Sequence, residues 1–123
     1  MRPVYLYDWK DSKLQGMLDD FQIKKEDIEG CNILFASYTN ENYSGNAFVL
    51  FEKDQNLYEV NGSHCSCYGL ETYWEPELTT VEAIEDRITK GYLGSNAYEG
   101  ESFDKELLSV LKKIKKAKKN DPI

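Results

Sequence analysis

The sequence predicts an α+β fold, in which a small antiparallel sheet of about three to four strands packs with three helices. Two apolar runs separated by a short polar turn predict a central β-hairpin. Apolar residues at helical spacing occur before and after this hairpin, without the regular alternation of helices and strands that a parallel sheet requires. The 123 residues suit a single domain with an ordinary core.

The predicted hairpin consists of residues 47–51 and 57–61, joined by Asp54-Gln55-Asn56. Residues 47–51 are apolar at both alternating sets of positions, which is typical of a strand that is covered on both faces. Asn56 is expected to take the left-handed conformation of the turn, because asparagine tolerates it.

Two further strands are expected before the hairpin. Residues 33–38 are again apolar on both alternating sets, and a polar loop over residues 39–45 should follow. Near the N-terminus, Tyr5, Tyr7 and Trp9 alternate with other residues, which predicts a short edge strand.

Three helices are expected from apolar spacing and capping residues. The first covers residues 12–21 after Asp11-Ser12, and a short turn over residues 23–29 stops at Gly30. Thr79 and Glu82 have the spacing of a capping box, with Thr79 or Thr80 as the N-cap of the second helix. The third is an amphipathic, basic C-terminal helix that starts at residues 102–104; its apolar stripe is Leu107, Leu108, Val110, Leu111 and Ile114.

The apolar stripe of the last helix ends at Ile114, and lysines fill the positions around and beyond it. We therefore expect one α+β domain over residues 1–111, followed by a lysine-rich helical tail, residues 112–123, that frays. The charge divides similarly. Residues 1–103 contain 8 Lys/Arg and 19 Asp/Glu, a net of −11, and residues 104–123 contain 7 and 3, a net of +4.

The N-terminus lacks a basic segment followed by an apolar run, and no apolar run is long enough for a bilayer. Three cysteines, an odd number, do not suit a secreted disulfide framework. We therefore expect a cytoplasmic protein with reduced thiols and no membrane partner. The acidic body argues against nucleic acid as a partner, except through the basic tail.

Four residues are candidate metal ligands: Cys31, His64, Cys65 and Cys67. Zinc takes thiolate and imidazole ligands, but the Cys-x-Cys spacing differs from that of knuckle-type sites. In an extended segment, Cys65 and Cys67 would point the same way and His64 the opposite way. The alternative is that the thiols are structural and half-buried.

No catalytic residue is predicted, so the sequence favours a protein that is not an enzyme. Phosphate-binding glycine loops, a serine nucleophile elbow and a zinc-protease motif are all missing from the sequence. The single histidine, His64, adjoins Cys65, and adjacent side chains rarely form a nucleophile–base pair. An acidic surrounding would also raise the pKa of a cysteine thiol, which opposes thiolate formation.

The irregular segment over residues 62–76 is the candidate binding surface. Tyrosine and tryptophan dominate binding hot spots, because they bury a large area with few rotatable bonds. We expect aromatic rings and carboxylates of this segment to face outward together. The predicted binding residues are Tyr68, Glu71, Tyr73, Trp74, Glu75 and Glu77.

Residues 32–77 resemble a family of small uncharacterised proteins of bacterial viruses and prophages. The resemblance rests on AFVLFEKDQNLYEV, then NGSHCSCYGLE and WEPE, and the following helix TTVEAIEDRI, which together cover about half of the chain. The family has no established activity, so the resemblance implies no site residue. It implies a phage or prophage accessory protein in the cytoplasm of a bacterial host.

The leading hypothesis is a non-enzymatic phage or prophage accessory protein that binds a host or viral protein through an acidic, aromatic surface. An inhibitor of nucleic-acid-handling or defence machinery is one form of it, because an acidic body can occupy a basic groove. The alternatives are a small zinc-binding structural domain and nucleic-acid binding through the lysine-rich C-terminal helix. The sequence leaves the oligomeric state open, a homo-oligomer included.

Overall fold

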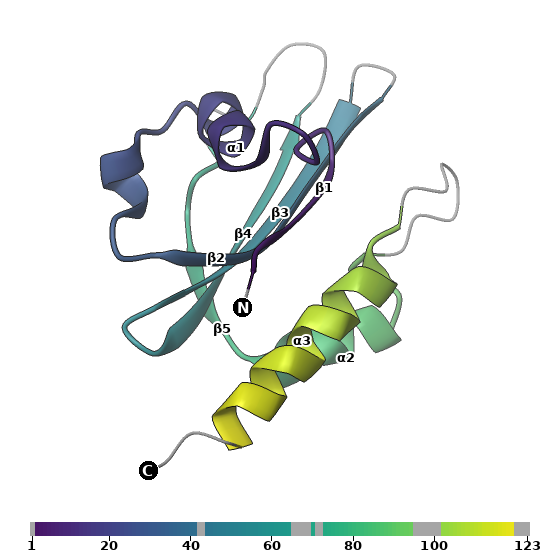
Figure 1. Ribbon diagram of the computed structural model, residues 1–123. Coiled ribbons are helices and arrows are strands. Elements are labelled where there is room, and N and C mark those ends of the chain that lie inside the picture. The colour runs from purple at the N-terminus through teal and green to yellow at the C-terminus, as the bar shows by residue number, and fades with distance from the viewer. Residues whose placement is uncertain (1, 42–43, 65–69, 71–72, 95–101, 120–123) are drawn as a thin grey trace. The chain divides into compact units, whose positions relative to one another are not determined.

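The computed structural model describes residues 2–41, 44–64, 70, 73–94 and 102–119 (Figure 1). It has a five-stranded mixed sheet and three α-helices, which confirms the predicted α+β class. The chain forms two compact units, Arg2–Leu78 and Thr79–Ile123. The elements are β1 (Val4–Tyr7), α1 (Lys13–Phe21), the 3-10 helix η1 (Lys25–Ile28), β2 (Asn32–Glu41), β3 (Ser44–Lys53), β4 (Asn56–His64), β5 (Glu77–Thr79), α2 (Val81–Thr89) and α3 (Asp104–Lys119).

The strands lie in the order β1-β2-β3-β4-β5. The pairs β2–β3 and β3–β4 are antiparallel, whereas β1 runs parallel to β2, so the sheet is mixed rather than purely antiparallel. The sheet also has one strand more than the largest number predicted. The additional strand, β5, has only three residues, which is too short for an alternating apolar pattern to reveal it.

The predicted central hairpin is present as β3 and β4, but its turn differs from the prediction. Lys53 pairs with Asn56, so Asn56 belongs to β4 and the turn contains only Asp54 and Gln55. Both turn residues have positive φ, 53° and 69°. A two-residue turn that matches the twist of the strands requires positive φ at both central positions, which explains why Asn56 is not the left-handed residue.

The expected polar loop over residues 39–45 is wrong. The β2–β3 pairing continues through Thr39–Asn46 to Glu41–Ser44, so most of these residues belong to the two strands. Thr39 contributes to this pairing through its side chain, because the backbone N–H of Asn46 donates to Thr39 Oγ1 at 3.4 Å. Polar residues therefore extend the strands here instead of ending them.

A β-bulge in β2 determines which side chains enter the core under α1. Ile33 pairs with Phe51 and Phe35 pairs with Leu50, so Leu34 is an extra residue. The extra residue brings Ile33 and Ala36 to the same face, although three positions separate them. Strict alternation would have placed these two residues on opposite faces.

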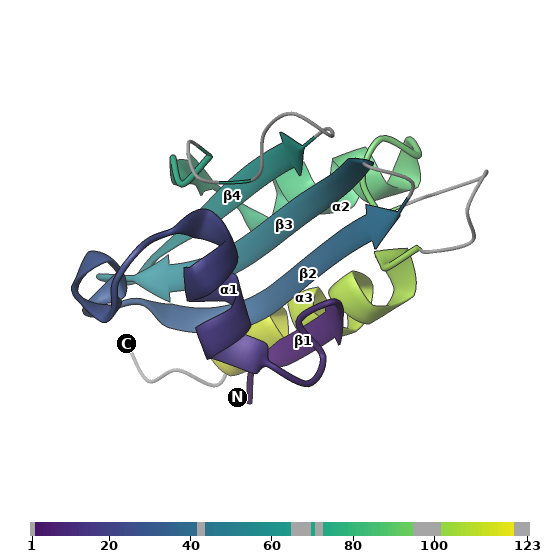
Figure 2. The same cartoon turned by 90° about the horizontal axis from the view of Figure 1, so that it is seen from above.

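Helix α1 lies over the face of the sheet that carries Ile33 and Val49 (Figures 1 and 2). Its buried residues are Met17, Leu18 and Phe21. Gly16 allows the preceding chain to pack against the helix, because a Cβ at this position would lie 1.9 Å from Ser12 Oγ. Ser12 is the N-cap residue, as predicted, but its hydroxyl donates to the carbonyl of Asp8 rather than capping the helix.

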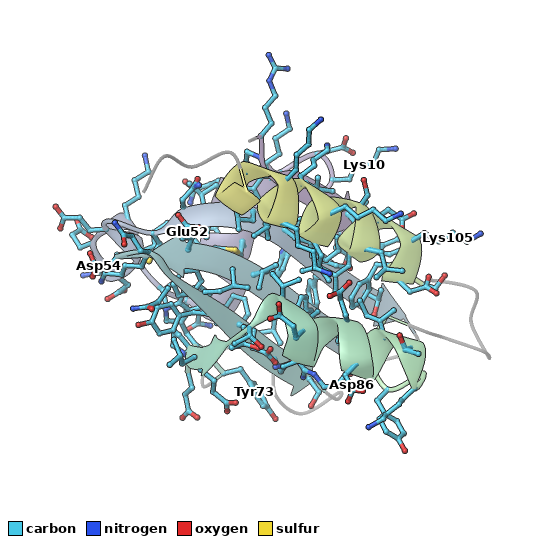
Figure 3. The ribbon with its side chains drawn as sticks, turned by 90° about the horizontal axis from the view of Figure 1, so that it is seen from below. Lys10, Glu52, Asp54, Tyr73, Asp86 and Lys105 are labelled. Carbon is cyan, nitrogen blue, oxygen red and sulfur yellow. The ribbon has the colours of Figure 1, made fainter. Side chains whose placement is uncertain are left out.

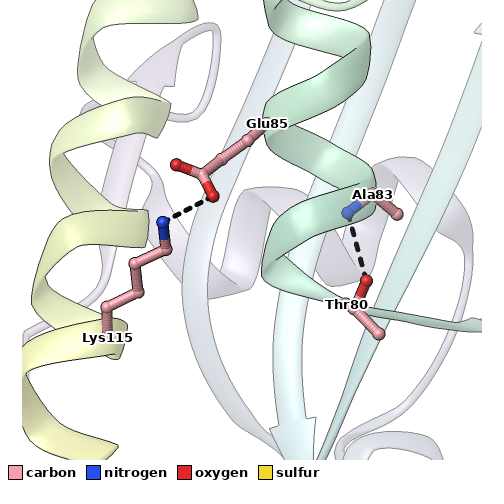
Figure 4. A network of polar contacts seen from close by, with 4 residues as sticks. All are labelled: Thr80, Ala83, Glu85 and Lys115. Atoms are coloured by element: carbon pink, nitrogen blue, oxygen red, sulfur yellow. Dashed lines mark hydrogen bonds and ion pairs between the residues drawn. The ribbon is translucent and has the colours of Figure 1, made fainter. Parts of the chain in front are cut away.

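The second unit contains α2 and α3. Thr80 is the N-cap of α2, and its Oγ1 accepts a hydrogen bond from the Ala83 backbone N–H at 3.1 Å (Figure 4). Lys115 Nζ of α3 lies 2.7 Å from Glu85 Oε1 of α2, which joins the two helices. Both helices have buried apolar stripes; these residues are Val81, Ile84, Ile88, Leu107, Val110, Leu111 and Ile114.

The expected boundary between residues 111 and 112 falls inside α3, which is continuous through Lys119. Leu111 and Ile114 are both buried, so the apolar stripe continues into the first part of the lysine-rich segment.

Among the described residues, no helix is both long enough and apolar enough to cross a membrane.

Phe21 tests the core of the first unit. Its side chain is fully buried and contacts Trp9 and Trp74, so Phe21→Ala should lower the free energy of unfolding by about 3–5 kcal/mol. Urea titration followed by tryptophan fluorescence measures this, because both tryptophans of the chain lie in this unit. Leu78→Ala is the control; its side chain is 68% exposed, and the expected change is within about 0.5 kcal/mol. Equal effects of the two changes would contradict the packing described.

Candidate functional site

A chain of ring contacts crosses the core of the first unit. The rings contact one another in the order Tyr38, Trp9, Phe21, Trp74, Phe51 and Tyr58, with centroid distances of 5.1, 5.7, 5.1, 5.9 and 5.4 Å. Such pairs add about 0.5–1.5 kcal/mol each beyond the area that they bury. The buried indole of Trp9 also donates from Nε1 to Asp20 Oδ2 at 2.7 Å. The chain therefore connects the N-terminal segment, α1 and the sheet to Trp74.

Trp74 and its neighbours are held against β4 by close packing. Leu70 is 1% exposed, and a Cβ at Gly62 of β4 would lie 3.2 Å from its side chain and 3.1 Å from Tyr73 Cβ. The Tyr73 N–H donates to the Leu70 carbonyl at 3.0 Å, and the Glu75 N–H donates to the Tyr73 carbonyl at 2.8 Å. The second bond closes a three-residue turn with Trp74 at its apex. A side chain at position 62 would therefore crowd the segment where it approaches the strand.

Beyond Trp74 the side chains turn to solvent. Glu75, Pro76 and Glu77 are exposed, and Leu78 is 68% exposed. Tyr73 and Trp74 are half-buried, and the Tyr73 ring extends beyond the ribbon in Figure 3. We call residues 73–78 the docking surface: two half-buried rings on a fixed backbone, followed by two exposed carboxylates and an exposed leucine.

The structure brings together part of the predicted binding set. Tyr73, Trp74, Glu75 and Glu77 lie in the docking surface, whereas Tyr68 and Glu71 lie outside the described residues. The expectation that the rings of this segment face outward is wrong for Trp74, because its ring packs at 5.1 Å against Phe21 and at 5.9 Å against Phe51. Sequence reasoning missed Leu78, a single apolar residue between polar neighbours that carries no periodic signal.

The unit that carries the docking surface is strongly acidic. Residues 2–78 contain 6 Lys/Arg and 14 Asp/Glu, a net charge of −8. The docking surface itself contains two carboxylates and no cation. A partner that approaches this surface therefore meets negative charge at short range, where salt screens it least.

The four candidate metal ligands do not meet at one point. Cys31 precedes Asn32, which pairs with Glu52 of β3, whereas His64 pairs with Gly45 of β3. The two partner residues are seven positions apart along β3, which is about 23 Å at about 3.3 Å per residue. Zinc lies about 2.0–2.3 Å from its ligands, so Cys31 and His64 cannot share an ion. Within the described part of the chain, no group of three His, Cys, Asp or Glu residues could hold a metal.

Cys65 and Cys67 lie outside the described residues, and a zinc site limited to His64, Cys65 and Cys67 stays a prediction. The register of the sheet excludes only Cys31 from the four candidate ligands. The remaining three residues would need a fourth ligand from elsewhere, because structural zinc is almost always four-coordinate.

Cys31 is half-buried beside Lys53 and Asp54, at the end of the sheet where Figure 3 shows Glu52 and Asp54. Burial raises the pKa of its thiol; the Lys53 ammonium lowers that pKa, and the Asp54 carboxylate raises it further. A raised pKa leaves less thiolate at neutral pH, and the thiolate is the nucleophile. This environment disfavours Cys31 as a catalytic nucleophile.

Comparison of the chain with protein-family models, with curated proteins and with solved structures finds no match.

The pKa of Cys31 leads to a reactivity prediction. Cys31 should be alkylated by iodoacetamide more slowly than a free cysteine at neutral pH, and the rate should rise with pH as thiolate forms. Lys53→Gln should slow the reaction and Asp54→Asn should accelerate it, because these changes remove the opposing charges. Peptide mass spectrometry separates Cys31 from the other two cysteines. Alkylation of Cys31 at the rate of a free cysteine would contradict the assignment.

Proposed function

We propose that this protein is a non-enzymatic binding protein that docks through residues 73–78 onto a basic protein surface. The observation that carries the proposal is the contrast within the segment. Trp74 is fixed by contacts with Phe21 and Phe51, while Glu75 and Glu77 next to it are exposed. A backbone that is already ordered loses little conformational entropy when it binds.

The side chains of the docking surface are of the kinds that mark binding hot spots. The outer parts of two partly buried rings supply contact area, and the exposed leucine adds an apolar group that solvent does not favour. The carboxylates around them supply charge complementarity, which accelerates encounter and selects against acidic partners. The net charge of −8 for residues 2–78 extends this preference beyond the segment itself.

The partner class that we propose is a nucleic-acid-handling or defence protein of a bacterial host or of the virus. Such proteins carry basic grooves for phosphates, and an acidic surface can occupy a groove of this kind. The resemblance of residues 32–77 to phage and prophage proteins supports this setting, in which the chain would act as an accessory protein in the bacterial cytoplasm.

Matched charge variants test the docking surface. The immobilised protein is exposed to bacterial lysate, and retained proteins are quantified by mass spectrometry. Glu75→Lys with Glu77→Lys should reduce retention of the specific partner at least tenfold, because the carboxylates that complement it become cations. Leu78→Ser should also reduce retention, with an effect that is less sensitive to salt.

The control is Asp11→Lys with Glu29→Lys, which changes the net charge by the same amount at exposed positions outside the docking surface. This variant should retain the partner nearly as well as the unchanged protein. Equal losses for the two double variants would show that only the net charge matters. Full retention by the Glu75/Glu77 variant would show that partners bind elsewhere.

A further inference from the structure

The exposed side of α3 carries a regular stripe of lysines. Its buried residues, Leu107, Leu111 and Ile114 among them, occupy one side of the helix. Lys105, Lys112 and Lys116 are exposed. At 3.6 residues per turn these three lysines fall within about 40° of one another, opposite the buried side, and extend over about 16 Å. We call them the lysine stripe.

The interaction of lysines with the helix dipole explains only part of this arrangement. Lysines near a helix C-terminus are favoured by the helix dipole, but that effect falls off within the last turn. Lys112 and Lys113 lie more than a turn before Lys119, where α3 ends. Like charges at a spacing of four residues also repel one another, as Lys112 does with Lys116. The stripe therefore destabilises the isolated helix slightly instead of supporting it.

Lys115, next to Lys116, has a different role. Lys115 lies at the flank of the helix and forms an ion pair with Glu85 of α2 at 2.7 Å (Figure 4). Within the part of the chain that the structure describes, no carboxylate forms an ion pair with Lys112, Lys113 or Lys116. The exposed lysines are thus available to an external anion, while Lys115 helps to hold α3 in place.

We propose that the lysine stripe of α3 binds the phosphodiester backbone of nucleic acid, without reading its sequence. Lysine binds phosphate as a point charge, and a row of lysines on an ordered helix displaces counterions along a strand. A membrane surface fits less well, because helices that lie on membranes insert an apolar face and most apolar residues of α3 are buried in the fold. A second copy of this chain fits less well, because a contact between an acidic and a basic surface is head-to-tail and closes only for particular rotations.

Fluorescence anisotropy with a labelled duplex of about 20 base pairs and arbitrary sequence tests this, across about 50–200 mM KCl. The logarithm of the binding constant should fall linearly with the logarithm of the salt concentration. Lys112→Gln with Lys116→Gln should make that slope shallower by about 1.8, because each phosphate contact contributes about 0.9. The control, Lys10→Gln with Lys25→Gln, removes two exposed lysines of the other unit and should leave the slope unchanged. Circular dichroism checks that both variants keep their helix content.

Three outcomes would overturn the proposal: no binding at the lowest salt concentration, equal loss of slope in both variants, or stripe-dependent binding to phosphatidylserine vesicles without binding to the duplex. A salt slope that depends on Lys112 and Lys116 but not on Lys10 and Lys25 supports it. The docking surface over residues 73–78 is not involved, so this proposal stands or falls independently of the proposed function.

Discussion

The packing of the Trp74 indole against Phe21 and Phe51 ties together the parts of the first unit on which the docking surface depends. One contact reaches α1 at 5.1 Å and the other reaches β3 at 5.9 Å. Because Trp74 is also the apex of a three-residue turn, its position sets the direction in which Glu75 leaves the core. The exposed carboxylates therefore belong to the ordered framework, although their side chains are in solvent.

Much of the fold could be predicted because its signals are local. The strands around Asp54, the start of α1 after Ser12 and the N-cap at Thr80 follow from short stretches of sequence. The bulge at Leu34 could not be predicted, since residues 33–36 are all apolar and any register buries apolar side chains. The parallel pairing of β1 with β2 depends on residues about 30 positions apart, and no local pattern encodes it.

For the candidate site, too, the composition could be predicted from the sequence but the geometry could not. The composition of residues 73–77 identified a segment rich in rings and carboxylates, but not which of its side chains the core would hold. That depends on the close approach of Gly62 to Tyr73 and on Phe21, which lies about 50 residues before Trp74, so no local pattern shows that their rings pack together. Likewise, the separation of Cys31 from His64 follows from strand register, which the adjacency of His64 and Cys65 does not reveal.

The net charge of −7 gives an incomplete account of what the chain can bind. At physiological ionic strength the Debye length is about 8 Å, so a partner responds mainly to the charges nearest to it. Under the two proposals, the acidic docking surface and the lysine stripe therefore select partners of opposite charge within one small protein. The two surfaces are built in the same way. The packed Trp74 ring holds the backbone next to Glu75, and the buried Leu111 and Ile114 hold the backbone next to Lys112 and Lys116. In both places, buried apolar groups order the backbone beneath charges that face solvent, and an ordered backbone loses little conformational entropy when it binds.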